Sequence, residues 1–314
     1  ASDVYKRQIY NIGEYIKARR TELGITQKEL AEGICTTVTL SRIEQNKENP
    51  QDFILKSILQ RLGLSGSDIL FATTGSELIY NQLKFDIRQA YILEDYNKAE
   101  KILSDNKEAI SKLPPANKQT FETIDILLKI NRRELSDEEA LSRLEAAIRL
   151  TCPKYTKDNP PGFLTYEEIL LLNNIALRYA HLNDSETAIR LLYHIKNFYD
   201  KQVCDIEETL RTKSMVLYNL SKYLGLVKRY DDCISICGEG IKLATETGRC
   251  LDLSNTYYNL SWSLYHRNKP GDKEASLYYM KLAYYNACTM NKKVSIEKYS
   301  KVILDRYDIT VESL

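Results

Sequence analysis

The sequence contains little of what secreted, membrane-spanning or metal-binding proteins need. Its 314 residues include seven cysteines and three histidines, and neither set shows the paired spacing of a zinc site. No apolar run approaches the length of a membrane span, and the N-terminus lacks the basic, apolar and small-residue order of a signal peptide. We therefore expect a cytoplasmic protein that binds no metal or other cofactor. Cys233 and Cys237 share a helix face, where packing is favoured over redox sensing.

The chain also lacks an excess of charge of one sign and any catalytic signature. The formal net charge is +1, so nonspecific electrostatics cannot carry binding to a polyanion for the whole chain. Basic and acidic residues are equally numerous between Ile9 and Leu70, so positive charge there would have to gather on one face. There is no Gly-rich phosphate loop, and no arrangement of Ser, His and Asp stands out. We expect no enzyme activity, and the absence of strand patterns predicts an all-α fold.

The stretch Thr26–Pro50 has the spacing of two short helices joined by a turn. Thr26 is a good N-cap and Glu29 follows three residues later, so a helix should begin directly after Thr26. After a break of small residues, Leu40 and Ile43 set the inner face of a second helix. Amphipathic helices precede and follow this pair. The pattern predicts a helix-turn-helix domain over residues 9–72.

The outer face of this motif carries the side chains that we expect to bind DNA. The second helix offers hydroxyl groups and one guanidinium, which read base edges in a major groove, while Gln27 at the start of the first helix is placed to hold a phosphate. A generic helix pair with a polar surface is the less favoured alternative. The candidate DNA-binding residues are Gln27, Lys28, Thr36, Thr37, Thr39, Ser41, Arg42 and Lys47.

Two segments of the sequence, IGEYIKARRTELGITQKELAEGI and LSRIEQNKENP, resemble the DNA-binding domain of the Xre and phage-repressor family. The turn departs from that family's pattern, because Cys35 replaces the common glycine. The resulting GIC-x4-LSRIE form is similar to the peptide-responsive regulators grouped as Rap/NprR/PlcR/PrgX, and closest to the PlcR type. The resemblance implies two partners, a double-stranded DNA operator and a short signalling peptide. We also expect a homodimer, since one such domain buries too little surface for tight operator binding.

The remaining sequence, residues 76–314, reads as paired helices after a Gly, Ser and Thr cluster near residues 72–75. Small residues that follow an acidic turn recur at intervals of roughly 40 to 50 residues in the second helix of each pair. This pattern resembles a tetratricopeptide repeat with lengthened helices, so we predict an α-solenoid with a terminal capping helix. Residues 1–8, ASDVYKRQ, fit no pattern and are interpreted as a non-native leader. The recurring small residues are Ala99, Ala140, Ala188, Cys233 and Ala275.

Asparagines occupy matching places in three successive first helices, which line the inner wall of such an array. An amide both donates and accepts, so the row can hold an extended peptide by its backbone, or it can bond neighbouring helices and fix their register. Two cations near the end of an earlier first helix are placed to meet a peptide carboxylate. The candidate peptide-binding residues are Asn173, Asn174, Asn219, Asn259, Tyr258, Lys129 and Arg132.

The two predicted domains together favour one function over another. The favoured interpretation is a transcription regulator whose helical-repeat domain binds a signalling peptide and thereby controls operator binding. The alternative is an adaptor whose repeat domain docks a protein partner, with DNA binding secondary. A groove lined by Asn and Tyr favours the peptide, whereas an open apolar groove favours the folded partner.

Overall fold

The computed structural model describes residues 12–50, 52–62, 75–92, 95–162, 164–201, 206–248 and 252–311. Within these ranges the protein is helical, and the only β-type pairing is an isolated bridge between Thr156 and Asn159. The all-α prediction is therefore confirmed. The chain divides into two compact units, Ala1–Phe121 and Glu122–Leu314.

Four short helices of the first unit surround one small core. Thr26 starts the second helix through the predicted capping box: its hydroxyl accepts from the Glu29 N–H at 3.2 Å, and the Glu29 carboxylate accepts from the Thr26 N–H at 2.7 Å. The helices are α1 (Ile12–Glu22), α2 (Gln27–Ala31), α3 (Thr37–Glu44) and α4 (Asp52–Arg61). The core consists of Ile16, Leu30, Ala31, Leu40, Ile43, Ile58, Leu59 and Leu62.

The turn between α2 and α3 explains how Cys35 replaces a glycine. The left-handed backbone conformation falls on Gly33, with φ of 72°, so Cys35 does not need it. The Cys35 N–H instead donates to the carbonyl of Ala31 at 3.0 Å, and its side chain packs against the core. Thr36 then caps α3 by accepting a hydrogen bond from the Thr39 N–H at 3.0 Å.

The helices that follow form pairs, as the sequence predicts. The second helix of the first pair is interrupted at Asn106, whose side chain donates to the Ile102 carbonyl at 2.8 Å and so competes with the backbone. Of the boundary predicted near residues 72–75, residues 72–74 lie outside the described residues, as do residues 1–8, and α6 begins at Gly75. The helices are α6 (Gly75–Ile92), α7 (Tyr96–Asp105), α8 (Lys107–Ser111), α9 (Pro115–Asn131) and α10 (Asp137–Arg149).

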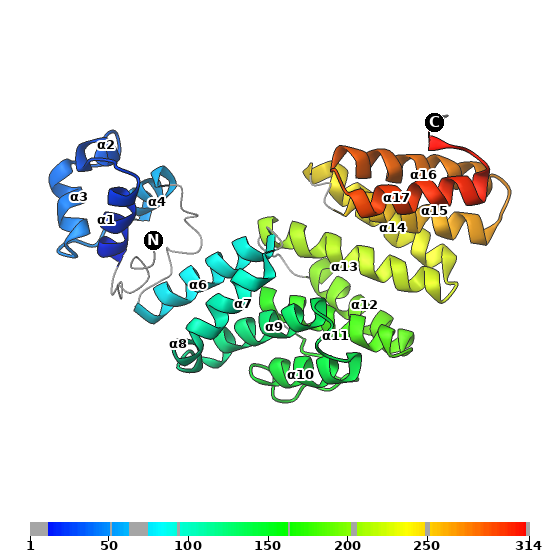
Figure 1. The fold of residues 1–314 in the computed structure, drawn as a ribbon, viewed down its shortest axis with the longest axis horizontal. Coiled ribbons are helices and arrows are strands. Elements are labelled where there is room, and N and C mark those ends of the chain that lie inside the picture. The colour runs from blue at the N-terminus through cyan, green and yellow to red at the C-terminus, as the bar shows by residue number, and fades with distance from the viewer. Residues whose placement is uncertain are drawn as a thin grey trace. The chain divides into compact units, whose positions relative to one another are not determined.

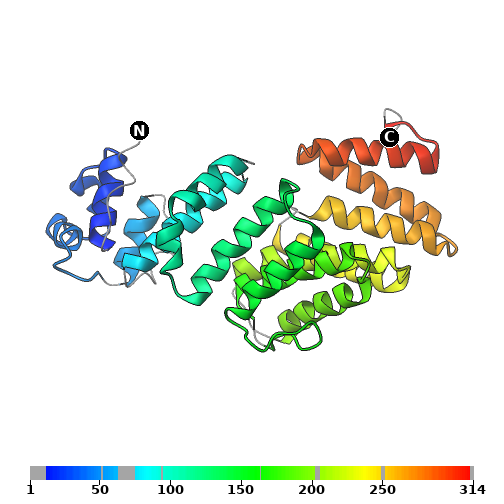
Figure 2. The same cartoon turned by 60° about the horizontal axis from the view of Figure 1, so that its bottom comes forward.

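The second unit continues as antiparallel helix pairs that stack side by side (Figures 1 and 2). The first helices of successive pairs also contact each other directly, α11 with α13 and α13 with α15, so they form one continuous layer. We call this layer the inner wall. The pairs are α11 (Tyr166–His181) with α12 (Ser185–Lys201), α13 (Ile206–Leu226) with α14 (Tyr230–Thr247), and α15 (Leu253–Arg267) with α16 (Asp272–Thr289), and α17 (Lys293–Tyr307) packs on α16.

Small residues allow the two helices of each pair to approach closely. Ala140, Ala188 and Cys233 are fully buried, as the repeat pattern predicts. In the last pair the prediction was wrong by one position, because Ala275 is only half-buried and Ser276 is fully buried. The Ser276 hydroxyl donates to the carbonyl of Ser261 at 2.7 Å, and the Ser261 hydroxyl donates to that of Ser276 at 2.8 Å. Each serine donates its hydroxyl hydrogen bond to the other's carbonyl group, which explains why serine stands at this helix crossing.

Gly13 is required at the start of α1 because α3 approaches it closely. Its N–H donates to Asn46 Oδ1 at 3.0 Å, and a Cβ at this position would overlap the carbonyl oxygen of Ile43. We expect Gly13→Ala to lower the free energy of unfolding of the first four helices by about 1 to 3 kcal/mol. Hydrogen exchange of the α1 and α3 amides in the full chain measures this change.

The matched control for that substitution is Gly238→Ala in α14. A Cβ at Gly238 meets open space, so the same chemical change should stabilise α14 by about 0.5 to 1 kcal/mol. Unchanged protection of the α1 amides in Gly13→Ala would contradict the close approach.

Candidate functional site

The exposed face of α3 is centred on residues that differ in part from the predicted set. Val38 is 63% exposed, and Arg42 and Gln45 follow it at helical spacings of four and seven residues. Ser41 lies beside this stripe, half-buried, while Thr37 and Thr39 flank it on opposite sides. The helix thus presents a branched methyl group, an amide and a guanidinium together, the groups that contact thymine methyls, adenine and guanine in a major groove.

Several hydroxyl groups of α3 are engaged within the helix itself. The Thr36 oxygen caps the Thr39 N–H, and the two hydroxyls lie 2.9 Å apart. Ser41 Oγ accepts a hydrogen bond from Gln45 Nε2 at 3.1 Å. Thr36 therefore has a structural role at the start of α3, and contact of Thr36, Thr37, Thr39 and Ser41 with DNA stays a prediction.

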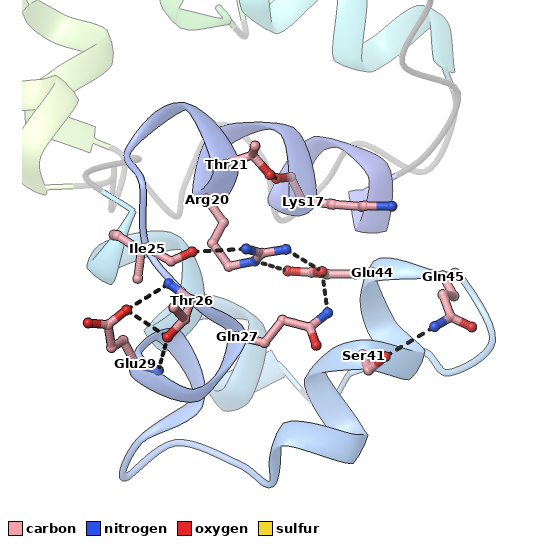
Figure 3. Close-up of polar contacts among 10 residues, drawn as sticks. All are labelled: Lys17, Arg20, Thr21, Ile25, Thr26, Gln27, Glu29, Ser41, Glu44 and Gln45. Carbon is pink, nitrogen blue, oxygen red and sulfur yellow. Dashed lines mark hydrogen bonds and ion pairs between the residues drawn. The ribbon is translucent and has the colours of Figure 1, made fainter.

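A buried carboxylate fixes α3 against the two helices before it (Figure 3). Glu44 is 3% exposed and accepts from Arg20 Nε at 2.6 Å and from Arg20 Nη2 at 3.0 Å. Gln27 Nε2 donates to the same carboxylate at 2.7 Å, while Arg20 Nη1 donates to the Ile25 carbonyl at 2.9 Å. The hydrogen bond to Glu44 raises the pKa of Arg20. Gln27 thus helps to position α3, and its phosphate contact stays a prediction.

The cations of the first four helices divide into two groups. Arg20 is bound to Glu44, and Arg61 donates to the carbonyl oxygen of Leu30 at 3.0 Å and so satisfies the end of α2. The second group remains exposed: Arg42 lies 3.9 Å from Glu48 in a weak, solvent-exposed contact. Lys28 and Lys47 are exposed as well. The positive charge available for a phosphate backbone is therefore carried by the exposed cations, and Arg20 is not among them.

The asparagines of the inner wall bond neighbouring helices. Asn219 Nδ2 donates to Asn173 Oδ1 at 3.0 Å, and both side chains are buried. Asn259 Nδ2 donates to Ser221 Oγ at 2.9 Å and to the Tyr218 carbonyl at 3.3 Å. These bonds join α11 to α13 and α13 to α15, which is the register-fixing role named as the alternative. Direct contact of these amides with a peptide stays a prediction.

The other residues predicted to contact a peptide already have partners within the protein. Asn174 donates to the Leu170 carbonyl of its own helix at 2.8 Å. Lys129 lies 2.6 Å from Asp125, and Arg132 lies 3.7 Å from Glu134, so neither cation is an unpaired site for a peptide carboxylate. Tyr258 is half-buried and stacks on the Tyr299 ring at 5.2 Å.

Three cations of the second unit were missed by the sequence analysis. Lys222 lies on α13, while Lys298 and Arg306 lie on α17. The repeat alignment contained a signal for the first of these, because Lys222 follows Asn219 by the same three residues that separate Trp262 from Asn259. One turn beyond Asn219 and Asn259, the inner wall therefore carries a cation and an aromatic ring.

Metal-binding and membrane-spanning features were also sought among the residues that the structure describes. No group of three His, Cys, Asp or Glu side chains there could hold a metal ion. No helix in the same ranges combines the length and apolarity that a bilayer crossing requires. Cys233 and Cys237 are buried free thiols with sulfurs 3.9 Å apart, and burial raises the pKa of Cys237.

The fold and these surfaces define a helix-turn-helix protein with an appended helical-repeat domain. Residues 16–69 match the family model described as "Helix-turn-helix", and residues 140–308 match the one described as "RNPP family C-terminal domain". The second match spans more than half of the chain. The protein belongs to the RNPP family, which confirms the resemblance to the Rap/NprR/PlcR/PrgX group.

Solved structures share this fold at low sequence identity. PlcR of Bacillus thuringiensis, in complex with the peptide PapR7 and DNA, has a TM-score of 0.63 and 19% identity over 91% of this chain and 98% of that one. The SHP pheromone receptor Rgg2 of Streptococcus dysgalactiae has a TM-score of 0.55 and 14% identity over 95% and 100%. ComR of S. thermophilus, with DNA and its signalling peptide ComS, has a TM-score of 0.51 and 15% identity over 94% and 99%. No curated protein sequence matches the chain.

The buried Glu44 pair predicts a large effect of a small substitution. Glu44→Gln keeps the shape of the side chain but leaves the Arg20 guanidinium without a negative partner, so the first four helices should lose about 3 to 5 kcal/mol of stability. Protection of the α1 and α3 amides in hydrogen exchange reports this loss. Glu48→Gln, at an exposed carboxylate, should stay within about 0.5 kcal/mol of the parent. Equal protection in the two variants would show that the Arg20–Glu44 pair does not hold α3.

Proposed function

We propose that this protein is a transcription regulator that binds double-stranded DNA through α3 and a short signalling peptide through its helical-repeat domain. One observation carries the proposal: a helix-turn-helix with an exposed stripe of base-reading groups shares a chain with an RNPP C-terminal domain. The helix-turn-helix domain is proposed to span residues 9–72 and the repeat domain residues 76–314. Cytoplasmic location follows from the same function, because the operator lies in the cytoplasm of a bacterium.

The geometry of α3 supports the DNA-binding half of this proposal. Its inner face is fixed by Leu40, Ile43 and the buried Glu44 carboxylate, so its outer face is held in one orientation. A recognition helix needs such pre-organisation, since each base contact depends on a side-chain position within the groove. Val38, Arg42 and Gln45 are proposed to face base edges, and Lys28 and Lys47 to contact phosphates.

The structural neighbours support the peptide-binding half. PlcR was solved with the peptide PapR7 and DNA together, and ComR with DNA and its signalling peptide ComS. These neighbours are regulators and not enzymes, so we assign no catalytic activity to this chain. The inner wall of the second unit is the proposed peptide surface, because half-buried aromatic rings lie there beside the buried asparagines, with two cations of α17 over the rings.

A homodimer is proposed on energetic grounds. Single helix-turn-helix domains bury too little surface for operator binding at physiological salt, whereas two copies on a two-part site multiply their affinities. A peptide then acts as a switch if it binds one arrangement of the two copies more tightly than the other. Moving such an equilibrium from mostly off to mostly on takes about 5 kcal/mol of differential binding.

The DNA-binding half is tested by substitution of Arg42. Selection of random duplex DNA on the full chain should yield a two-part consensus site, and Arg42→Ala should weaken binding to it by about 1 to 3 kcal/mol per copy while helicity by circular dichroism stays constant. Arg190→Ala serves as the control. It removes an exposed arginine of α12 that pairs with Asp158, and it should bind the selected DNA as tightly as the parent does. Tight binding of Arg42→Ala to the parent's consensus would remove Arg42 from the DNA surface.

The peptide-binding half is tested with a random heptapeptide library. The full chain should retain a subset of extended peptides, and a retained peptide should change the affinity for the selected DNA by at least about tenfold, which is the size of ordinary coupling between two sites. Mass spectrometry identifies the peptides, and fluorescence anisotropy of labelled DNA measures the coupling. Retention of a folded helical protein in place of any peptide would favour the adaptor function.

A further inference from the structure

Two cations of α17 lie over aromatic rings of α15, a helix of the inner wall. The Lys298 ammonium lies 3.9 Å from the centroid of the Tyr258 ring, and the Arg306 guanidinium carbon lies 4.3 Å from that of Trp262. Lys222, on α13, lies close enough that its charge lowers the pKa of Lys298. The cluster therefore spans three neighbouring helices, α13, α15 and α17.

Within the described residues, no carboxylate balances these three clustered cations. Arg178 is paired with Asp137 and Lys129 with Asp125, whereas Lys222, Lys298 and Arg306 form no ion pair with any acidic residue of the described ranges. Arg306 Nη1 is also buried without a hydrogen-bond acceptor. A buried donor of a guanidinium without a partner costs free energy that an incoming acceptor would restore.

The electrostatic effects on the two lysines agree with this geometry. Burial lowers the pKa of Lys298, and the charges of Lys222 and Arg306 lower it further. Burial likewise lowers the pKa of Lys222, with a smaller contribution from Arg178. Lys222 and Arg306 are half-buried and Lys298 is exposed. The three like charges repel one another, and an anion placed among them would relieve that repulsion.

We infer that Lys222, Lys298 and Arg306, together with the rings of Tyr258 and Trp262, bind a carboxylate of the signalling peptide and the apolar side chain next to it. The inference rests on the proposed function and adds the chemical class of the ligand, a peptide that is anionic at one end or at one side chain. Arg306 offers a fork of donors that matches a carboxylate, and the rings offer an apolar surface beside it.

The site also fits a peptide better than an inorganic anion. Asn259 lies one turn before Trp262 on α15, so polar amides and aromatic rings follow one another along the wall. An inorganic anion would contact only the cations, whereas a peptide would contact both the cations and the aromatic rings. The carboxylate comes either from the C-terminus of the peptide or from an Asp or Glu side chain, and the same chemistry serves both.

The test uses the full chain and random heptapeptides in three forms: with a free C-terminus, with an amidated C-terminus, and amidated without Asp or Glu. The form that lacks every carboxylate should be retained at least about tenfold less than the free form, since a charge-assisted bond contributes about 1.5 to 3 kcal/mol. Retention of the amidated form that keeps Asp and Glu assigns the carboxylate to a side chain, and its loss assigns it to the C-terminus.

Substitutions locate the effect on the wall. Lys222→Met, Lys298→Met and Arg306→Gln should each weaken binding of a retained peptide by about tenfold or more. Their thermal stability without peptide should equal or exceed that of the parent, because each removes a like charge from the cluster. Lys242→Met, at an exposed lysine of α14 beside Glu246, is the matched control and should bind as the parent does.

The outcomes separate this inference from the proposed function. Retention of peptides without any preference for a carboxylate, or with the same affinity in Lys222→Met and Lys298→Met as in the parent, overturns the inference and leaves the peptide-binding function standing. Failure to retain a peptide in any form overturns both.

Discussion

A pair of amphipathic helices cannot bury its apolar face alone, and the whole second unit follows from that constraint. Each pair from α11 to α16 covers the face left open by the one before it, and α17 packs on the last of them. Close packing requires a small residue where two helices cross, which is why Ala140, Ala188 and Cys233 are fully buried. The same stacking brings first helices together, so cations and rings from distant parts of the sequence meet on one wall.

The first four helices solve a different problem, since they are too few and too short to enclose a large core. Their apolar contacts are supplemented by a buried ion pair between Arg20 and Glu44, to which Gln27 also donates. Pairs of this kind contribute less to stability than to the choice of one arrangement, because a misplaced α3 would leave a charge buried without its partner. Arg20 therefore stabilises the fold and does not add positive charge to the proposed DNA-binding surface, which Arg42, Lys28 and Lys47 supply.

The sequence predicted local structure well because its signals are local. The capping box of Thr26 and Glu29 predicted where α2 begins, and the resemblance at residues 12–34 and 40–50 indicated the family. The sequence did not predict which side chains of different helices contact each other. The pattern identified Asn173 and Asn219 but not their mutual bond, and it did not pair Arg178 of α11 with Asp137 of α10. Only the folded chain shows which cation has an acid beside it, since that acid can lie anywhere in the sequence.

The bond between Asn219 and Asn173 also determines how the array can deform. A shift of one helix along its neighbour by a single residue, about 1.5 Å, would break this buried bond, whereas a small rotation about it keeps both atoms in reach. Asn259 repeats the arrangement with Ser221 one pair further on. These buried hydrogen bonds between neighbouring first helices resist sliding of one helix along the next, but they permit small rotations of one repeat relative to the next. If rotations of the same sense occurred at successive repeats, a modest change at one repeat would become a larger displacement several repeats away.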